Sequence, residues 1–167
     1  MTLQEYQLEA RKTAYHTAHL GMEYCVMKIA EELGELDQAI GSGNREAIKL
    51  EGGDVFWHLA DIYTRYGVVI TERVEEIAFR RVDDVTSYSI QRHLARASGT
   101  MCGAVAKGLS RGVEPNKETI LAAADIVLAL TCKIMRQFNH ILSDVLVANL
   151  AKLAARQAAG TVLGGDR

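Results

Sequence analysis

Four acidic residues in two short stretches are the side chains of this chain best suited to chemistry. Glu32 and Glu35 lie three residues apart, and Glu51 and Asp54 repeat that spacing further along. Residues three apart on a helix project from the same face, so two antiparallel helices would bring the four carboxylates together. Like charges in such positions repel one another. A hard cation such as Mg²⁺ or Mn²⁺ would resolve the conflict, because it prefers oxygen ligands.

The alternative is a solvated helix face on which acidic residues are scattered without a metal. Taken alone, the four acids leave both interpretations open.

The elements that would position these acids are helices. The chain has a single proline, and apolar residues recur three and four apart over long stretches, which predicts an all-α helical bundle. Thr2 and Glu5 form the pattern of a capping box, and Asn44 suits the N-cap of the helix that follows. We expect helices at about 3–18, 21–40, 45–66, from 71 toward 81, 87–110, 117–138 and 143–158.

Two adjacent glycines, Gly52 and Gly53, stand in the middle of the helix expected at 45–66. Each lowers the stability of a helix by roughly 0.5–1 kcal/mol relative to alanine. They lie directly between the acids Glu51 and Asp54.

The second half of the chain repeats the plan of the first. Asp125 follows a leucine four residues earlier, just as Asp54 does, and the order of expected helices is similar. We interpret this as a degenerate internal duplication, with repeats at 1–83 and 84–167 packed as one unit. Only Asp125 persists among the acids. At the positions of Glu31, Glu32, Glu35 and Glu51, the second repeat has Arg96, Ala97, Thr100 and Ala122.

Composition limits the partners and the compartment. The 167 residues suffice for one domain or two small repeats, and the net charge of −2 gives no basic footprint for nucleic acid. The three cysteines lie far apart and form no C-x-x-C motif, which favours a reducing cytoplasm. No apolar run approaches the roughly 18 residues needed to span a membrane, and the first residues do not form a signal peptide. We expect a cytoplasmic protein without nucleic-acid or membrane partners.

Taken together, these motifs resemble the MazG family of all-α nucleoside triphosphate pyrophosphohydrolases. The acids form the pattern E-E-x-x-E followed by E-x-x-D, and residues 53–60 read G-D-V-F-W-H-L-A. Residues 149–156 follow N-x-x-K-L-x-x-R, and the chain ends in G-G-D-R. His58 stands where the family usually has tyrosine. The resemblance is good over residues 1–81, fair at the far C-terminus and faint over 84–115.

The resemblance implies a role for each matching residue. Mg²⁺, or Mn²⁺ in its place, would be bound by Glu32, Glu35, Glu51 and Asp54. Substrate contacts would come from Asn149, Lys152, Arg156 and Trp57. Glu31 and Glu35 are the catalytic candidates, because a carboxylate at the metal can orient or deprotonate the attacking water. A polar helix face is the alternative for the C-terminal set, and a place in the core or an interface is the alternative for Trp57. For His58, a packed or surface histidine is simpler than a metal ligand.

Enzymes of this family cleave an NTP or dNTP between the α and β phosphates, giving a nucleoside monophosphate and pyrophosphate. The first repeat has the acids, whereas the second has the Asn/Lys/Arg helix. We therefore hypothesise a pseudo-dimer with one composite site. Because members of the family are generally oligomeric, we also expect a homodimer or a higher homo-oligomer.

Three other functions compete with this hypothesis. The first is a non-catalytic nucleotide-binding or regulatory protein of the same fold. The second is a carboxylate-bridged di-iron bundle, which would need Glu-x-x-His pairs that neither acidic motif contains. The third is a plain helical interaction module, which would bind no divalent metal.

Overall fold

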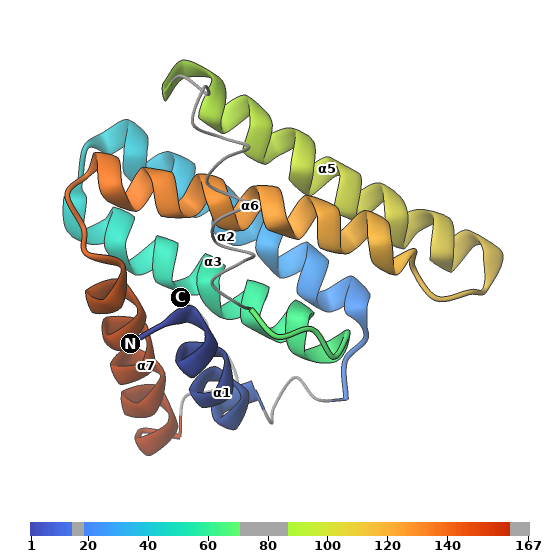
Figure 1. Ribbon diagram of the computed structural model, residues 1–167, viewed down its shortest axis with the longest axis horizontal. Coiled ribbons are helices and arrows are strands. Elements are labelled where there is room, and N and C mark those ends of the chain that lie inside the picture. The colour runs from blue at the N-terminus through green and yellow to red at the C-terminus, as the bar shows by residue number, and fades with distance from the viewer. Residues whose placement is uncertain (15–18, 71–86, 161–167) are drawn as a thin grey trace.

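The protein is all-helical in the computed structural model, which describes residues 1–14, 19–70 and 87–160 (Figure 1). This confirms the predicted fold class, and no strand is found in these three ranges. The helix expected from 71 toward 81 lies outside the described residues. The helices are α1 (Leu3–Thr13), α2 (Met22–Ser42), α3 (Arg45–Arg65), α5 (Ser87–Arg111), α6 (Lys117–Gln137) and α7 (Leu142–Ala158).

Local capping signals fix where several helices begin and end. The predicted capping box of α1 is present, since Thr2 Oγ1 accepts from the Glu5 amide and the Glu5 carboxylate accepts from the Thr2 amide. Asn44 caps α3 by accepting from the backbone amide of Ala47. Gly43 ends α2 in the left-handed conformation, at φ 67°, which suits glycine. Helix α1 ends at Thr13, before the predicted end at 18.

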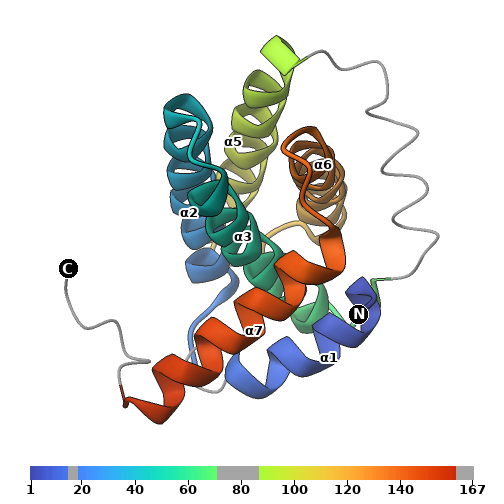
Figure 2. The same cartoon turned by 90° about the vertical axis from the view of Figure 1, so that its left-hand side faces the viewer.

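Two helical hairpins form the body of the protein. Helix α2 packs against α3, and α5 packs against α6 (Figures 1 and 2). The hairpins then pack on each other through α2 with α5 and α3 with α6. Helices α1 and α7 lie side by side against α3, on the side away from α5 (Figure 2). Helix α3 is therefore the central element, and its acids face several neighbours.

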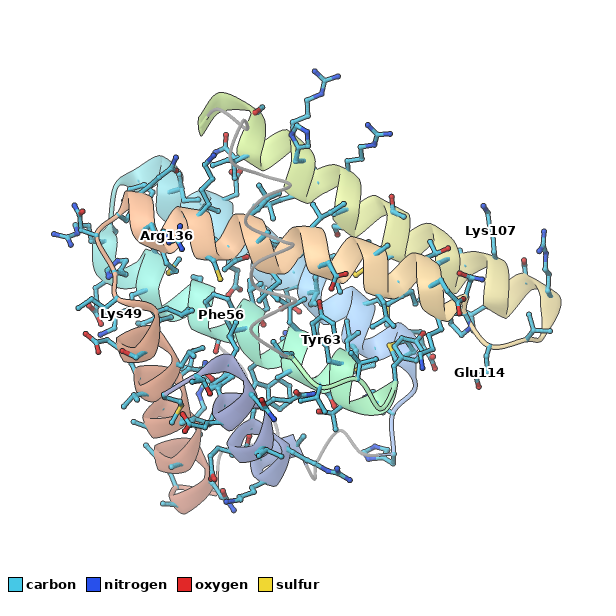
Figure 3. All side chains as sticks on the ribbon, viewed as in Figure 1. Lys49, Phe56, Tyr63, Lys107, Glu114 and Arg136 are labelled. Atoms are coloured by element: carbon cyan, nitrogen blue, oxygen red, sulfur yellow. The ribbon has the colours of Figure 1, made fainter. Side chains whose placement is uncertain are left out.

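One hydrophobic core runs through both hairpins. Ile29 and Leu59 from the first hairpin and Met101 and Leu128 from the second are completely buried in it. Figure 3 shows Phe56 and Tyr63 on α3 inside the bundle, and Lys107 and Glu114 at its right-hand end. None of the described helices is both long enough and apolar enough to cross a membrane.

The paired glycines of α3 are explained by how closely other helices approach. A Cβ atom at Gly52 would lie 2.5 Å from Met135 Cε of α6. A Cβ atom at Gly53 would lie 3.0 Å from Asn149 Cβ of α7. The glycines weaken α3 as a helix, but they let α6 and α7 pack directly on its backbone. Asp54, the next residue, is thereby brought within reach of α7.

Candidate functional site

Three of the four predicted acids converge where α2 faces α3. Glu32 and Glu35 project from α2 and Glu51 from α3, and one carboxylate oxygen of each lies within 4.8 Å of the others. We call these residues the carboxylate trio. Glu32 is buried, at 7% exposure, and the other two are partly exposed. The i, i+3 spacing on α2 and the antiparallel hairpin produce this convergence, as the sequence led us to expect.

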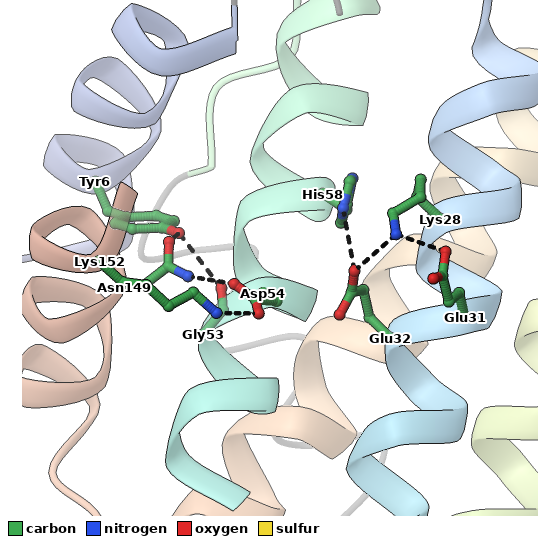
Figure 4. Close-up of polar contacts among 9 residues, drawn as sticks. All are labelled: Tyr6, Lys28, Glu31, Glu32, Gly53, Asp54, His58, Asn149 and Lys152. Atoms are coloured by element: carbon green, nitrogen blue, oxygen red, sulfur yellow. Dashed lines mark hydrogen bonds and ion pairs between the residues drawn. The ribbon is translucent and has the colours of Figure 1, made fainter. Parts of the chain in front are cut away.

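The fourth acid, Asp54, is held by the C-terminal helix α7. Asn149 Nδ2 donates to Asp54 Oδ1 at 2.8 Å, and the Lys152 ammonium pairs with Asp54 Oδ2 (Figure 4). Asn149 is fixed in turn, because the buried Tyr6 hydroxyl of α1 donates to its Oδ1 at 2.6 Å. Asp54 is therefore placed by three helices, and it links the α2–α3 hairpin to α7.

Glu32 has basic neighbours of its own. Lys28 Nζ lies 3.3 Å from Glu32 Oε1 and 2.5 Å from Glu31 Oε2. His58 Nε2 lies 3.7 Å from the same Glu32 oxygen. Burial opposes ionisation of Glu32, but His58 and Lys28 outweigh burial and lower the pKa of this carboxyl. Glu32 is thus kept as a carboxylate in an interior position.

Glu51 shows the opposite response. Burial, followed by the charges of Asp54 and Glu35, raises the pKa of Glu51, although the charge of Lys152 partly offsets this. In the described part of the chain, no lysine or arginine lies within ion-pair distance of Glu35 or Glu51. The trio therefore holds negative charge that its protein neighbours do not balance.

The donor set fits a hard divalent cation. All three members of the trio offer carboxylate oxygens, which Mg²⁺ and Mn²⁺ prefer. A cation at the trio would balance the charge that Glu35 and Glu51 carry. Among the described residues, no other group of three acids, histidines or cysteines is gathered in this way.

The remaining predicted residues are dispersed. Glu31 is exposed and bound to Lys28, so it stands at the rim of the trio. Trp57 is 5% exposed and donates from its indole nitrogen to Thr13 Oγ1 at 2.9 Å, which places it in the core between α1 and α3. Arg156 is exposed on α7, one turn beyond Lys152. The structure brings none of these three into the trio.

Sequence reasoning missed Tyr6 and Lys28 and left His58 as a packed or surface residue. Lys28 had a local signal, because it precedes Glu31 and Glu32 by three and four residues on one helix face. Tyr6 gave none, since its contact with Asn149 spans the length of the chain. His58 proves to be buried beside Glu32.

In the second hairpin, the one acid retained from the motif is Asp125, and it has a structural role. The Tyr63 hydroxyl of α3 donates to Asp125 Oδ1 of α6 at 2.5 Å. Burial and the Asp125 charge raise the pKa of Tyr63 well above its ordinary value. This contact ties the two hairpins together. Asp125 stands at the position that matches Asp54 of the first half.

Fold and site together define an all-helical protein with a carboxylate trio between two helices and an acid–amide–lysine network beside it. No protein-family model, curated protein or solved structure matched the chain. The likeness to MazG enzymes is therefore carried by the motifs alone, and a function must be argued from the geometry of these side chains.

Proposed function

We propose that this protein is a Mg²⁺-dependent nucleotide pyrophosphohydrolase, which cleaves an NTP or dNTP between the α and β phosphates to a nucleoside monophosphate and pyrophosphate. The observation that carries the proposal is the carboxylate trio, with the Asp54–Lys152 pair near enough to influence the pKa of its member Glu51. A polyphosphate needs both features, a bound divalent cation and a basic side chain facing it.

Glu32, Glu35 and Glu51 would hold Mg²⁺ or Mn²⁺, and by resemblance Asp54 would join them. When bound, such a cation neutralises phosphate charge and lowers the pKa of a coordinated water. Of the two catalytic candidates, Glu35 is better placed to orient the attacking water. It belongs to the trio and has no described basic partner, whereas Glu31 is exposed and engaged by Lys28.

The phosphates would be bound from the side of α7. Lys152 and Arg156 lie one turn apart on this helix, and Lys152 already reaches Asp54. Lysine offers a compact positive charge, and arginine offers a planar fork that matches two phosphate oxygens. Asn149 is 2% exposed and committed to Tyr6 and Asp54, so its part is to hold Asp54 in place.

This site would be a composite of the two halves of the chain. Its acids come from the α2–α3 hairpin, and its basic residues come from α7, which follows the α5–α6 hairpin. The packing of one hairpin on the other supports the hypothesis of a tandem pseudo-dimer. We extend the proposal to a homodimer or higher homo-oligomer in the cytoplasm, where cysteines such as the buried Cys25 and Cys132 stay reduced.

The test is pyrophosphate release from a panel of NTPs and dNTPs with Mg²⁺. We expect release by the wild type and a loss of about 100-fold or more in Glu35→Gln. Asp37→Asn is the matched control, because Asp37 is an exposed acid on the same helix and undergoes the same change of charge. It should retain activity.

Two outcomes would contradict the proposal. Equal losses in Glu35→Gln and Asp37→Asn would show that the trio has no special role. Nucleotide binding without release from any substrate would favour a non-catalytic regulatory protein instead.

A further inference from the structure

His58 is a buried histidine whose hydrogen bonding is incomplete. The residue is 6% exposed, and its ring lies on the face of α3 that is turned toward Glu32 (Figure 4). Nε2 approaches Glu32 Oε1 at 3.7 Å, while Nδ1 has no hydrogen-bond partner in the described structure. A buried polar atom without a partner destabilises the folded state, so its presence needs an explanation.

Packing alone does not explain a histidine at this position. The residues on either side, Trp57 and Leu59, are buried and apolar, and an apolar side chain at 58 would leave no nitrogen unpaired. Histidine contributes what an apolar residue cannot, namely an N–H that can be directed at a carboxylate. The one carboxylate that the described structure places beside the ring is that of Glu32.

His58 lies outside the trio. Its nitrogens are not among the ligand atoms that lie within 4.8 Å of one another, so its route to the trio runs through Glu32. Lys28 approaches the same Glu32 oxygen, Oε1, at 3.3 Å. Both contacts therefore engage one oxygen and leave the other free of them (Figure 4).

We propose that His58 is a positioning residue of the metal site, which orients the Glu32 carboxylate so that its second oxygen is available to a divalent cation. The inference rests on the proposed function, because it assumes that the trio binds such a cation. Groups that hydrogen-bond to a metal ligand set its orientation, and their removal typically lowers metal affinity 10–100-fold. Lys28 would remain in a His58 variant to keep Glu32 charged.

The test compares three variants of the full chain. In His58→Gln, the amide N–H can reach the position of Nε2; in His58→Asn, the amide is polar but too short. His58→Leu removes the donor. Mn²⁺ affinity is measured from the electron paramagnetic resonance signal of the free ion. Thermal unfolding without metal is followed by circular dichroism.

We expect His58→Leu and His58→Asn to weaken Mn²⁺ binding about 10–100-fold and His58→Gln to stay within about threefold of the wild type. The metal-free Tm shows whether a variant has lost stability, so that weakened Mn²⁺ binding is not mistaken for unfolding. If His58→Leu fails to fold, the comparison of Asn with Gln carries the test.

Glu51→Gln separates the two proposals. If the wild type binds Mn²⁺ and Glu51→Gln does not, the trio is a metal site whatever His58 does. In that case, Mn²⁺ affinity equal to that of the wild type in His58→Leu and His58→Asn would overturn only the positioning role of His58, and the metal site would stand. A lowered Tm in all three His58 variants with unchanged affinity would assign His58 to the core. Absence of Mn²⁺ binding by the wild type would overturn both proposals.

Discussion

Replacing glycines by alanine tests how α6 and α7 approach α3. Alanine favours a helix over glycine by roughly 0.5–1 kcal/mol, so an alanine with room for its Cβ should stabilise the protein. At Gly53, however, the new Cβ would lie 3.0 Å from Asn149 Cβ and 3.2 Å from its Nδ2. Asn149 is buried and held by Tyr6 and Asp54, so it has little freedom to move aside.

The expected magnitude follows from these opposing terms. Overpacking in a well-packed interior costs about 1–3 kcal/mol. Disturbing the two hydrogen bonds of Asn149 adds about 0.5–1.5 kcal/mol for each bond lost. With one of these bonds lost and the helix gain subtracted, Gly53→Ala should destabilise the protein by about 0.5–4 kcal/mol.

Two other glycines provide a graded comparison. A Cβ atom at Gly34 of α2 would have nothing within 4 Å, so Gly34→Ala should stabilise by about 0.5–1 kcal/mol. At Gly52, the clash at 2.5 Å is with the flexible end of Met135, which can change rotamer. Gly52→Ala should therefore fall between the other two.

Urea unfolding at equilibrium measures all three variants, with the midpoint and slope fitted for each. The expected order of stability is Gly34→Ala above Gly52→Ala above Gly53→Ala. A Gly53→Ala protein at least as stable as Gly34→Ala would refute the reasoning. It would mean that α7 does not pack on the backbone of α3 as described.

Two further predictions concern the network and the trio. Tyr6→Phe removes the hydroxyl that donates to Asn149, so a buried acceptor loses its donor. The variant should be less stable by about 1–3 kcal/mol in the same urea assay. An unchanged midpoint would count against the network of Tyr6, Asn149 and Asp54. The raised pKa of Glu51 means that the folded state binds the proton of this carboxyl more tightly than the unfolded chain does. The stability linked to this proton is therefore complete below pH 4.5 and is lost as the pH rises through the raised pKa. With metal chelated, Glu51→Gln should therefore be more stable than the wild type at pH 7, by less than about 1 kcal/mol for so exposed a group, and the difference should shrink in acid. A constant difference across this pH range, measured by thermal unfolding, would contradict the assignment.

Helices and their limits could be predicted from sequence because their signals are local. The helix expected at 45–66 is observed as Arg45–Arg65, and that expected at 117–138 as Lys117–Gln137. Apolar spacing and asparagine caps determine both. The trio could be anticipated for the same reason, since it needs only the i, i+3 rule and one hairpin.

What could not be predicted depends on how distant helices cross. The composite-site hypothesis joins the acids with the helix of Asn149 and Lys152, but it does not say that Asp54 is the acid they bind, because this depends on the crossing of α7 over α3. The glycines at 52 and 53 signal a close approach but not which helix makes it. The sequence leaves open whether Trp57 contacts a substrate or lies in the core, because its position depends on where α1 docks.

The length of chain between Tyr6 and Asn149 has a consequence for how the protein assembles. Their hydrogen bond joins residues 143 positions apart, whereas the trio needs only the adjacent helices α2 and α3. Contacts close in sequence form faster than distant ones, because less chain entropy is lost in closing the loop. During synthesis, the trio could gather while the C-terminal helix is still being made. Asp54 would acquire its amide and lysine partners only when α7 docks, so the trio would form before the network beside it.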